Sequence, residues 1–235
     1  MKQLTKHLHH FRLLYRSVIF VSLLVFYIAS RVGGGEDISQ IIESRPALLV
    51  AIWAVFVVEM VSRFFPSRLE NRGCQKQFGR YYIPTGSTEV RDPGSTGALK
   101  VLLVWIAFNM IFGALYLAGI LDEGVMLLLC SFYAVCDIIC ILYFCPFQSW
   151  IMKNRCCVTC RVYNWDYAMM FTPLFFVAKP YAWSLLFLSL VLLARWEITY
   201  YRHPERFSES TNEFLSCRHC QDKLCAHKKP IHNKR

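Results

Sequence analysis

Charged residues almost vanish from several long stretches of the chain and gather in the gaps between them. A helix needs roughly 20 apolar residues to cross the hydrocarbon core of a membrane. The stretches are continuously apolar rather than alternating, which excludes a membrane β-barrel. The pattern therefore predicts an all-α fold: a polytopic integral membrane helical bundle with about six membrane segments.

The predicted segments cover residues 17–32, 46–65, 101–121, 125–147, 166–178 and 181–201. The last two come from one apolar stretch that Lys179-Pro180 interrupts. A single helix over that stretch would be roughly 48 Å long, well beyond a ~30 Å hydrocarbon core. Because proline breaks helical hydrogen bonding and lysine is costly inside lipid, we expect a turn there. The fifth segment is short enough to be tilted, re-entrant or partly interfacial.

Lysine and arginine gather in four segments: 1–16, 67–100, 148–165 and the tail after Trp196. The turns after the first and third segments are acidic instead. Lys and Arg accumulate on the cytoplasmic side of membrane proteins. Six crossings place all four basic segments on that side, so we expect both termini in the cytoplasm and a plasma (inner) membrane location. Residues 1–201 would form the bundle, and residues 202–235 a basic, Cys/His-rich cytoplasmic tail.

Composition agrees with this interpretation, since 55% of the 235 residues are hydrophobic and only 18% are charged. A soluble domain carries about a quarter charged residues. No cleavage site of small residues follows the basic start, so we expect the first segment to be retained rather than removed as a signal peptide. The basic tail is expected to contact anionic headgroups of the lipid bilayer, at ~1 kcal/mol per Lys or Arg. A membrane or cytoplasmic protein partner is a further expectation, and nucleic acid is not expected.

Eleven cysteines give the chain its most specific chemistry. Two CxxC motifs fall in segments predicted to be cytoplasmic, where thiols stay reduced and clustered cysteines commonly bind metal. A CxxC turn aims both sulfurs at one tetrahedral site, as in structural zinc sites. One assignment joins four ligands from the loop and the tail: Cys157, Cys160, Cys217 and Cys220. The alternates are Cys156 in the loop and a tail-only set that adds Cys225 and His227 to the tail cysteines. Zinc is the expected cofactor, an iron–sulfur cluster is the alternative, and acylation of the cysteines is a third reading.

Polar residues inside the predicted segments are the other candidates. Asp137 lies near the middle of the fourth segment, where a carboxylate faces the bundle interior, and Asn109 of the third is its expected neighbour. Glu59 and Arg63 have the i,i+4 spacing of a helical ion pair. Cys130, Cys136 and Cys140 lie on the fourth segment, the last two one turn apart on the same face.

Arg202-His203-Pro204 resembles a tripeptide of membrane methyltransferases of the isoprenylcysteine carboxyl methyltransferase type, where it helps to bind S-adenosylmethionine. The likeness covers these three residues, and the aromatic and glycine that follow in that family are absent here. The plainer reading is that Pro204 ends the last helix.

The leading functional interpretation is a regulatory or structural/interaction membrane protein with a cytoplasmic metal-binding cysteine cluster. The alternatives are a membrane oxidoreductase or electron-transfer subunit that uses the same cysteines, and a small transporter that uses Asp137. Whether the chain is an enzyme stays open.

Overall fold

The computed structural model describes residues 4–33, 43–67, 70–87, 89–90, 95–154, 156–216 and 220. Its larger helices are α1 (Leu4–Gly33), α3 (Pro46–Ser62), α5 (Ser95–Leu117), α6 (Glu123–Leu142) and α8 (Pro180–Arg202). Shorter helical turns connect them: α4 (Arg72–Gln75), η1 (Gly79–Tyr81), the π-helical turn η2 (Phe147–Ile151), η3 (Arg161–Trp165), α7 (Asp166–Phe171), η4 (Thr172–Phe176), η5 (Pro204–Arg206) and η6 (Glu213–Leu215). An isolated bridge between Pro84 and Asn212 is the only β pairing in the described residues. The predicted all-α fold is confirmed.

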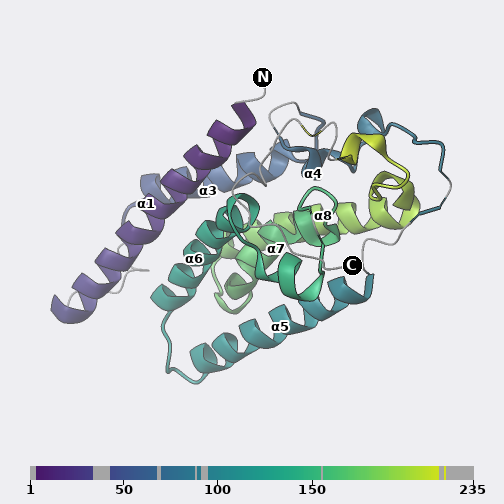
Figure 1. Ribbon diagram of the computed structural model, residues 1–235. Coiled ribbons are helices and arrows are strands. Elements are labelled where there is room, and N and C mark those ends of the chain that lie inside the picture. The colour runs from purple at the N-terminus through teal and green to yellow at the C-terminus, as the bar shows by residue number, and fades with distance from the viewer. Residues whose placement is uncertain are drawn as a thin grey trace.

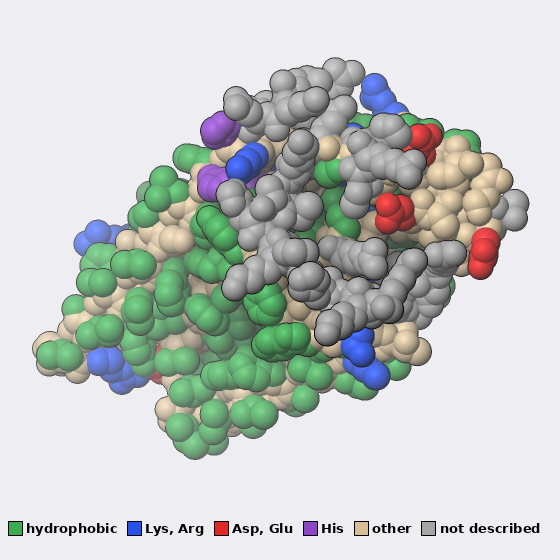
Figure 2. All heavy atoms as spheres, viewed as in Figure 1, with side chains coloured by type: hydrophobic (Ala, Val, Ile, Leu, Met, Phe, Trp, Pro, Cys, Tyr) green, Lys and Arg blue, Asp and Glu red, His purple; other side chains and the backbone are tan. Residues whose placement is uncertain are grey.

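Four helices of the described part, α1, α5, α6 and α8, are long and apolar enough to cross a membrane, whereas the apolar helix α3 is shorter, with 17 residues. Large side chains on these helices point outward: Val25 is 59% exposed, Ile111 59% and Phe187 70%. Hydrophobic side chains cover much of the face formed by α1, α5 and α6 (Figures 1 and 2). An apolar surface of this extent fits a membrane-embedded protein. The predicted count of six segments is not confirmed by these helices.

The chain turns at one end of the bundle, which we name the turn end. There Arg31, at the end of α1, pairs with Asp122, just before α6. Tyr181, at the start of α8, donates a hydrogen bond to Glu123 at 3.1 Å. These contacts show that α1 and α6 run in opposite directions and that α8 starts beside the start of α6.

The segment between Asp166 and Lys179 runs the length of α3. Asp166 pairs with Arg63, just after α3, and Lys179 pairs with Glu43, just before it, at 2.6 Å in each case. The segment changes from α-helix to 3₁₀-helix to extended backbone, which together cover roughly 30 Å. Val177 is 0% exposed, and half of the segment is buried, while Phe175 and Ala178 are exposed. Such irregular backbone is tolerated at membrane depth only where protein covers it.

The opposite end, which we name the loop end, gathers the connections that are rich in Lys and Arg. Residues 70–87 and the chain after α8 pair there: the Glu213 N–H donates to the Ile83 carbonyl at 2.8 Å, and the Thr85 N–H to the Thr211 carbonyl at 3.2 Å. His9, near the start of α1, contacts Asn71 at 3.2 Å. The segments that sequence reasoning assigned to one side of the membrane thus meet at one end of the bundle.

Several helix ends differ from the predicted segments. The first helix starts at Leu4, so the basic residues before position 17 are helical and continue into the apolar part. The fourth ends at Leu142, and a π-helical turn begins at Phe147. Pro146 lacks a backbone N–H, which explains why the helix cannot continue to Phe147 as expected.

Gly113 allows α5 to approach the η4 turn closely, because a Cβ at this position would overlap the ring of Phe176. We expect Gly113→Ala to lower the free energy of unfolding by about 1–3 kcal/mol through overpacking. Gly33→Ala is the control, since nothing lies within 4 Å of a Cβ there. Thermal unfolding in detergent measures both. If Gly113→Ala costs as much in a Phe176→Ala background as in the native chain, the proposed clash does not exist.

Candidate functional site

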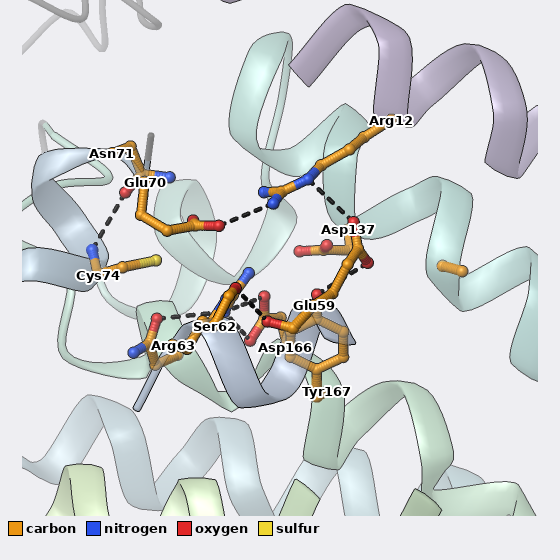
Figure 3. Close-up of polar contacts among 12 residues, drawn as sticks. Arg12, Glu59, Ser62, Arg63, Glu70, Asn71, Cys74, Asp137, Asp166 and Tyr167 are labelled. Carbon is orange, nitrogen blue, oxygen red and sulfur yellow. Dashed lines mark hydrogen bonds and ion pairs between the residues drawn. The ribbon is translucent and has the colours of Figure 1, made fainter. Parts of the chain in front are cut away.

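A network of buried ion pairs joins α1, α3 and α6, and Figure 3 shows Arg12, Glu59 and Asp137 close together in it. The carboxylate of Glu59 contacts Nε of Arg12 at 2.9 Å and Nη2 of Arg16 at 2.8 Å. Arg16 also donates to Asp137 at 2.9 Å, and the Tyr167 hydroxyl donates to Glu59 at 2.9 Å. The Arg16 side chain is only 1% exposed, so its charge is neutralised entirely inside the bundle.

A second set of ion pairs continues the network toward the loop end. Arg63 pairs with Asp166, and their side chains are 2% and 6% exposed. Arg12 pairs with Glu70 at 2.7 Å. Burial alone would raise the pKa of the Glu70 carboxyl, but the charges of Arg63 and Arg12 outweigh burial and hold this pKa below its usual value. The network therefore stabilises a charged carboxylate at the loop end.

The polar residues inside the predicted segments pair with partners other than those that their sequence spacing predicts. Glu59 and Arg63 do not form the expected i,i+4 pair within the described structure: Glu59 pairs with α1, and Arg63 with Asp166. Asp137 contacts Arg16 rather than Asn109. Asn109 instead donates to the Trp105 carbonyl at 3.0 Å and accepts from the Tyr133 hydroxyl at 3.3 Å. Contacts between helices have overridden contacts along one helix.

The first CxxC motif forms a tight turn around a buried lysine. The N–H of Cys160 donates to the carbonyl of Cys157 at 3.0 Å, which closes the turn. The ammonium of Lys76 donates to the carbonyls of Val158 and Cys160, both at 2.8 Å, and its side chain is fully buried. Burial lowers the pKa of Lys76 to about 8, while the neighbouring thiols, Cys160 foremost, act in the opposite direction. Burial likewise raises the pKa of the Cys160 thiol to about 12, which the Lys76 charge partly offsets.

The chain that leads to the second CxxC motif lies against this loop. Leu215, 2% exposed, packs with Cys156 and Val158 in a small apolar cluster. Arg72 of α4 holds Phe214, the residue before Leu215. Its guanidinium donates to the Phe214 carbonyl at 2.9 Å and lies 4.7 Å from the centre of the Phe214 ring. The loop and the start of the tail are therefore packed together.

A cavity of about 490 Å³ lies between α5, α6, the η2 turn and α7. Its walls are mostly aromatic and aliphatic, but sulfur is unusually frequent among them, with seven side chains: Cys136, Cys140, Cys145, Cys157, Cys160, Met169 and Met170. The thiols of Cys140 and Cys145 are hydrogen-bonded to each other. Cys157 donates from Sγ to Oε1 of Gln148 at 3.0 Å. The shared face expected for Cys136 and Cys140 is confirmed, because both line this cavity. Cys130 lies elsewhere, on a smaller cavity beside α3.

The predicted metal ligands are only partly within the described residues. Cys156, Cys157, Cys160 and Cys220 are described, whereas Cys217, Cys225 and His227 lie outside. Among the described residues, no three His, Cys, Asp or Glu side chains gather closely enough to hold a metal ion. The four-cysteine assignment and the tail-only assignment therefore both stay predictions.

The Arg-His-Pro tripeptide ends α8. The helix stops at Arg202, and Pro204 starts the η5 turn, as the plainer reading predicted. His203 contacts the carboxylate of Glu205 at 3.1 Å.

Sequence reasoning missed three residues of this region. Arg16 and Lys76 looked like ordinary basic residues of cytoplasmic segments, and Cys145 was not assigned a role. The available signal for Arg16 was its position directly before an apolar stretch on a continuing helix. Lys76 carries no such signal, since its burial depends on the distant loop that encloses it.

Comparisons with protein-family models, with curated proteins and with solved structures gave no match. The functional argument therefore rests on the geometry of this chain.

Arg16→Met tests the buried network. It leaves Asp137 without its cation inside the bundle, so we expect a loss of about 3–5 kcal/mol in the free energy of unfolding. Adding Asp137→Asn removes the unpaired charge and should recover part of the loss. Arg31→Met is the matched control, because Arg31 pairs with Asp122 while 53% exposed and should cost about 1 kcal/mol or less. Equal effects of the two single substitutions on thermal unfolding in detergent would contradict the network's role.

Proposed function

We propose that this chain is an integral membrane protein that crosses the membrane six times, with both termini in the cytoplasm. Two observations support six crossings. The segments rich in Lys and Arg meet at the loop end, which matches the expected distribution of basic residues. The irregular segment from Asp166 to Lys179 connects the loop end to the turn end, and so counts as a short crossing between α6 and α8.

Reporter fusions after residue 10 and after residue 230 should both report a cytoplasmic location. A cysteine introduced at Lys179 should react with a membrane-impermeant maleimide in intact cells, because it lies at the turn end. A cysteine at Arg80, in the loop-end η1 turn, is the matched control and should react only after the membrane is opened. A tail reporter found outside the cell would refute six crossings.

At the loop end, we propose that a thiolate site for zinc joins the loop to the tail through Cys157, Cys160, Cys217 and Cys220. The observation that carries this proposal is the packing of Leu215 against Cys156 and Val158. Cys217 follows two residues after Leu215 in the sequence, and the proposed site requires the second CxxC motif to lie near the first. Four thiolates from two such motifs are a common ligand set for structural zinc.

The surroundings suit thiolate ligands. Two CxxC motifs that supply four thiolates to Zn²⁺ leave two excess negative charges. Lys76 provides a buried positive charge beside the first motif. Metal binding would fasten the tail to the loop, and its free energy would stabilise the loop end. The role that follows is structural or regulatory: the metal would control whether the basic tail stays docked or is available to anionic lipid or a partner protein.

Metal analysis of the full-length protein, purified without chelators, tests this site. We expect about one zinc ion per chain, lost when Cys157 and Cys160 are replaced together by Ser and equally when Cys217 and Cys220 are. Loss of zinc should also increase proteolysis of the tail. Cys130→Ser is the matched control, because Cys130 is a buried thiol away from the loop end. Zinc retained by the Cys157/Cys160 variant but lost on replacing Cys225 and His227 would support the tail-only site instead, and wild-type protein without metal would refute both.

Two alternative functions can be distinguished from the zinc site. An iron–sulfur cluster on the same cysteines, as in an electron-transfer subunit, would give the purified protein visible absorption, which zinc does not. Transport through Asp137 is less favoured, because Asp137 already pairs with Arg16 at 2.9 Å. A transported cation would have to displace that arginine.

A further inference from the structure

The cavity beside α6 contains more sulfur than the loop-tail site uses. Two of its thiols, Cys140 in the last turn of α6 and Cys145 just beyond the helix, are hydrogen-bonded to each other. Neither belongs to a CxxC motif. The backbone at the end of α6 holds them together, since the Phe144 N–H donates to the Ile139 carbonyl at 3.1 Å and the Ser149 N–H to the Cys145 carbonyl at 3.0 Å.

The donor set of the cavity is soft. Met169 and Met170 of α7 add thioethers to the thiols of the wall. Thiolates and thioethers favour Cu(I), zinc and iron–sulfur clusters, whereas Mg²⁺ and Ca²⁺ require oxygen ligands. Zinc in structural sites takes four ligands, and no group of three suitable side chains is preassembled in the described residues. Two adjacent thiols match a cation that accepts two-coordinate ligation.

We propose that this cavity binds a soft monovalent cation of the Cu(I) type between the sulfurs of Cys140 and Cys145. The proposal does not depend on the loop-tail zinc site. Two S–H bonds break and two metal–sulfur bonds form, so two protons leave and the resulting complex carries one negative charge. Two sulfurs that bind one ion at a metal–sulfur distance of ~2.3 Å lie at most ~4.6 Å apart. Thiols that are hydrogen-bonded to each other already lie within that separation.

The walls favour retention of such an ion. The aromatic rings of Trp105, Phe144 and Trp150 line the cavity, so much of its wall is apolar. The Trp105 ring packs against Tyr133, with 4.6 Å between ring centres, so this wall is built from two helices. An apolar shell of this kind controls solvent access to a metal site.

Titration of the full-length protein with Cu(I), under anaerobic conditions and against a colorimetric Cu(I) chelator, tests the proposal. We expect about one Cu(I) retained per chain and an X-ray absorption spectrum with sulfur neighbours only. Ag(I), which has no redox chemistry here, should compete for the same site, and Zn(II) should not. Cys140→Ser and Cys145→Ser should each weaken retention by more than the ~100-fold that loss of an outer-shell partner costs.

Two controls separate this site from its alternatives. Cys130→Ser changes a buried thiol on the same helix outside this cavity, and should leave Cu(I) binding unchanged. Replacing Cys217 and Cys220 by Ser should remove zinc from the loop-tail site but not Cu(I) from the cavity, so the two proposals fail independently. Each variant is first checked for native thermal unfolding. Wild-type protein that releases all copper to the chelator, or Cys140 and Cys145 variants that retain it, would overturn the proposal.

Discussion

The buried charge of Arg16 is the constraint on which the arrangement of the bundle depends. An arginine on an apolar helix is costly at membrane depth unless it is paired within protein. Here α3 supplies Glu59 and α6 supplies Asp137, and both contact the same guanidinium within 2.9 Å. The two pairs therefore determine which faces of α3 and α6 meet the Arg16 side of α1.

The sequence predicts the positions of the helices but not the contacts between them. Apolar length predicts where helices form, and the ends of the five longer helices lie within several residues of the predicted segments, except that the first helix starts at Leu4 rather than at residue 17. It does not predict which faces meet, because an almost uniformly apolar helix such as α3 presents no distinct stripe. The i,i+4 spacing of Glu59 and Arg63 was misleading for that reason: contacts between helices are worth more inside the bundle than a pair along one helix, which contributes only ~0.2–0.5 kcal/mol. The grouping of loop segments was predictable, since the distribution of Lys and Arg depends on the membrane rather than on packing.

The segment from Asp166 to Lys179 has a structure that its hydropathy does not predict. Its residues are apolar enough for the membrane but too few for a straight α-helix across it. A stretched backbone gains length at the cost of helical hydrogen bonds, which lipid cannot replace. The bundle supplies cover instead: Tyr167 and Val177 are both 0% exposed. Sequence gave no sign of this solution, because the cover comes from helices distant in the chain.

Lys76 links this packing to the chemistry of the cysteine loop. Its ammonium is bound by two carbonyls of the loop and lies 5.2 Å from the centre of the Trp196 ring, so it is held by contacts that require no thiolate. Among the described residues the Lys76 ammonium pairs with no carboxylate, which makes its burial costly, and burial lowers its pKa to about 8. Deprotonated sulfur on the adjacent loop would offset that cost, and Lys76 would in turn offset the charge of the sulfur. Arg161, another cation of the described part of this loop, pairs with Glu197 at 2.6 Å. Lys76 is therefore the residue through which negative charge on the cysteine loop would stabilise the loop end as a whole.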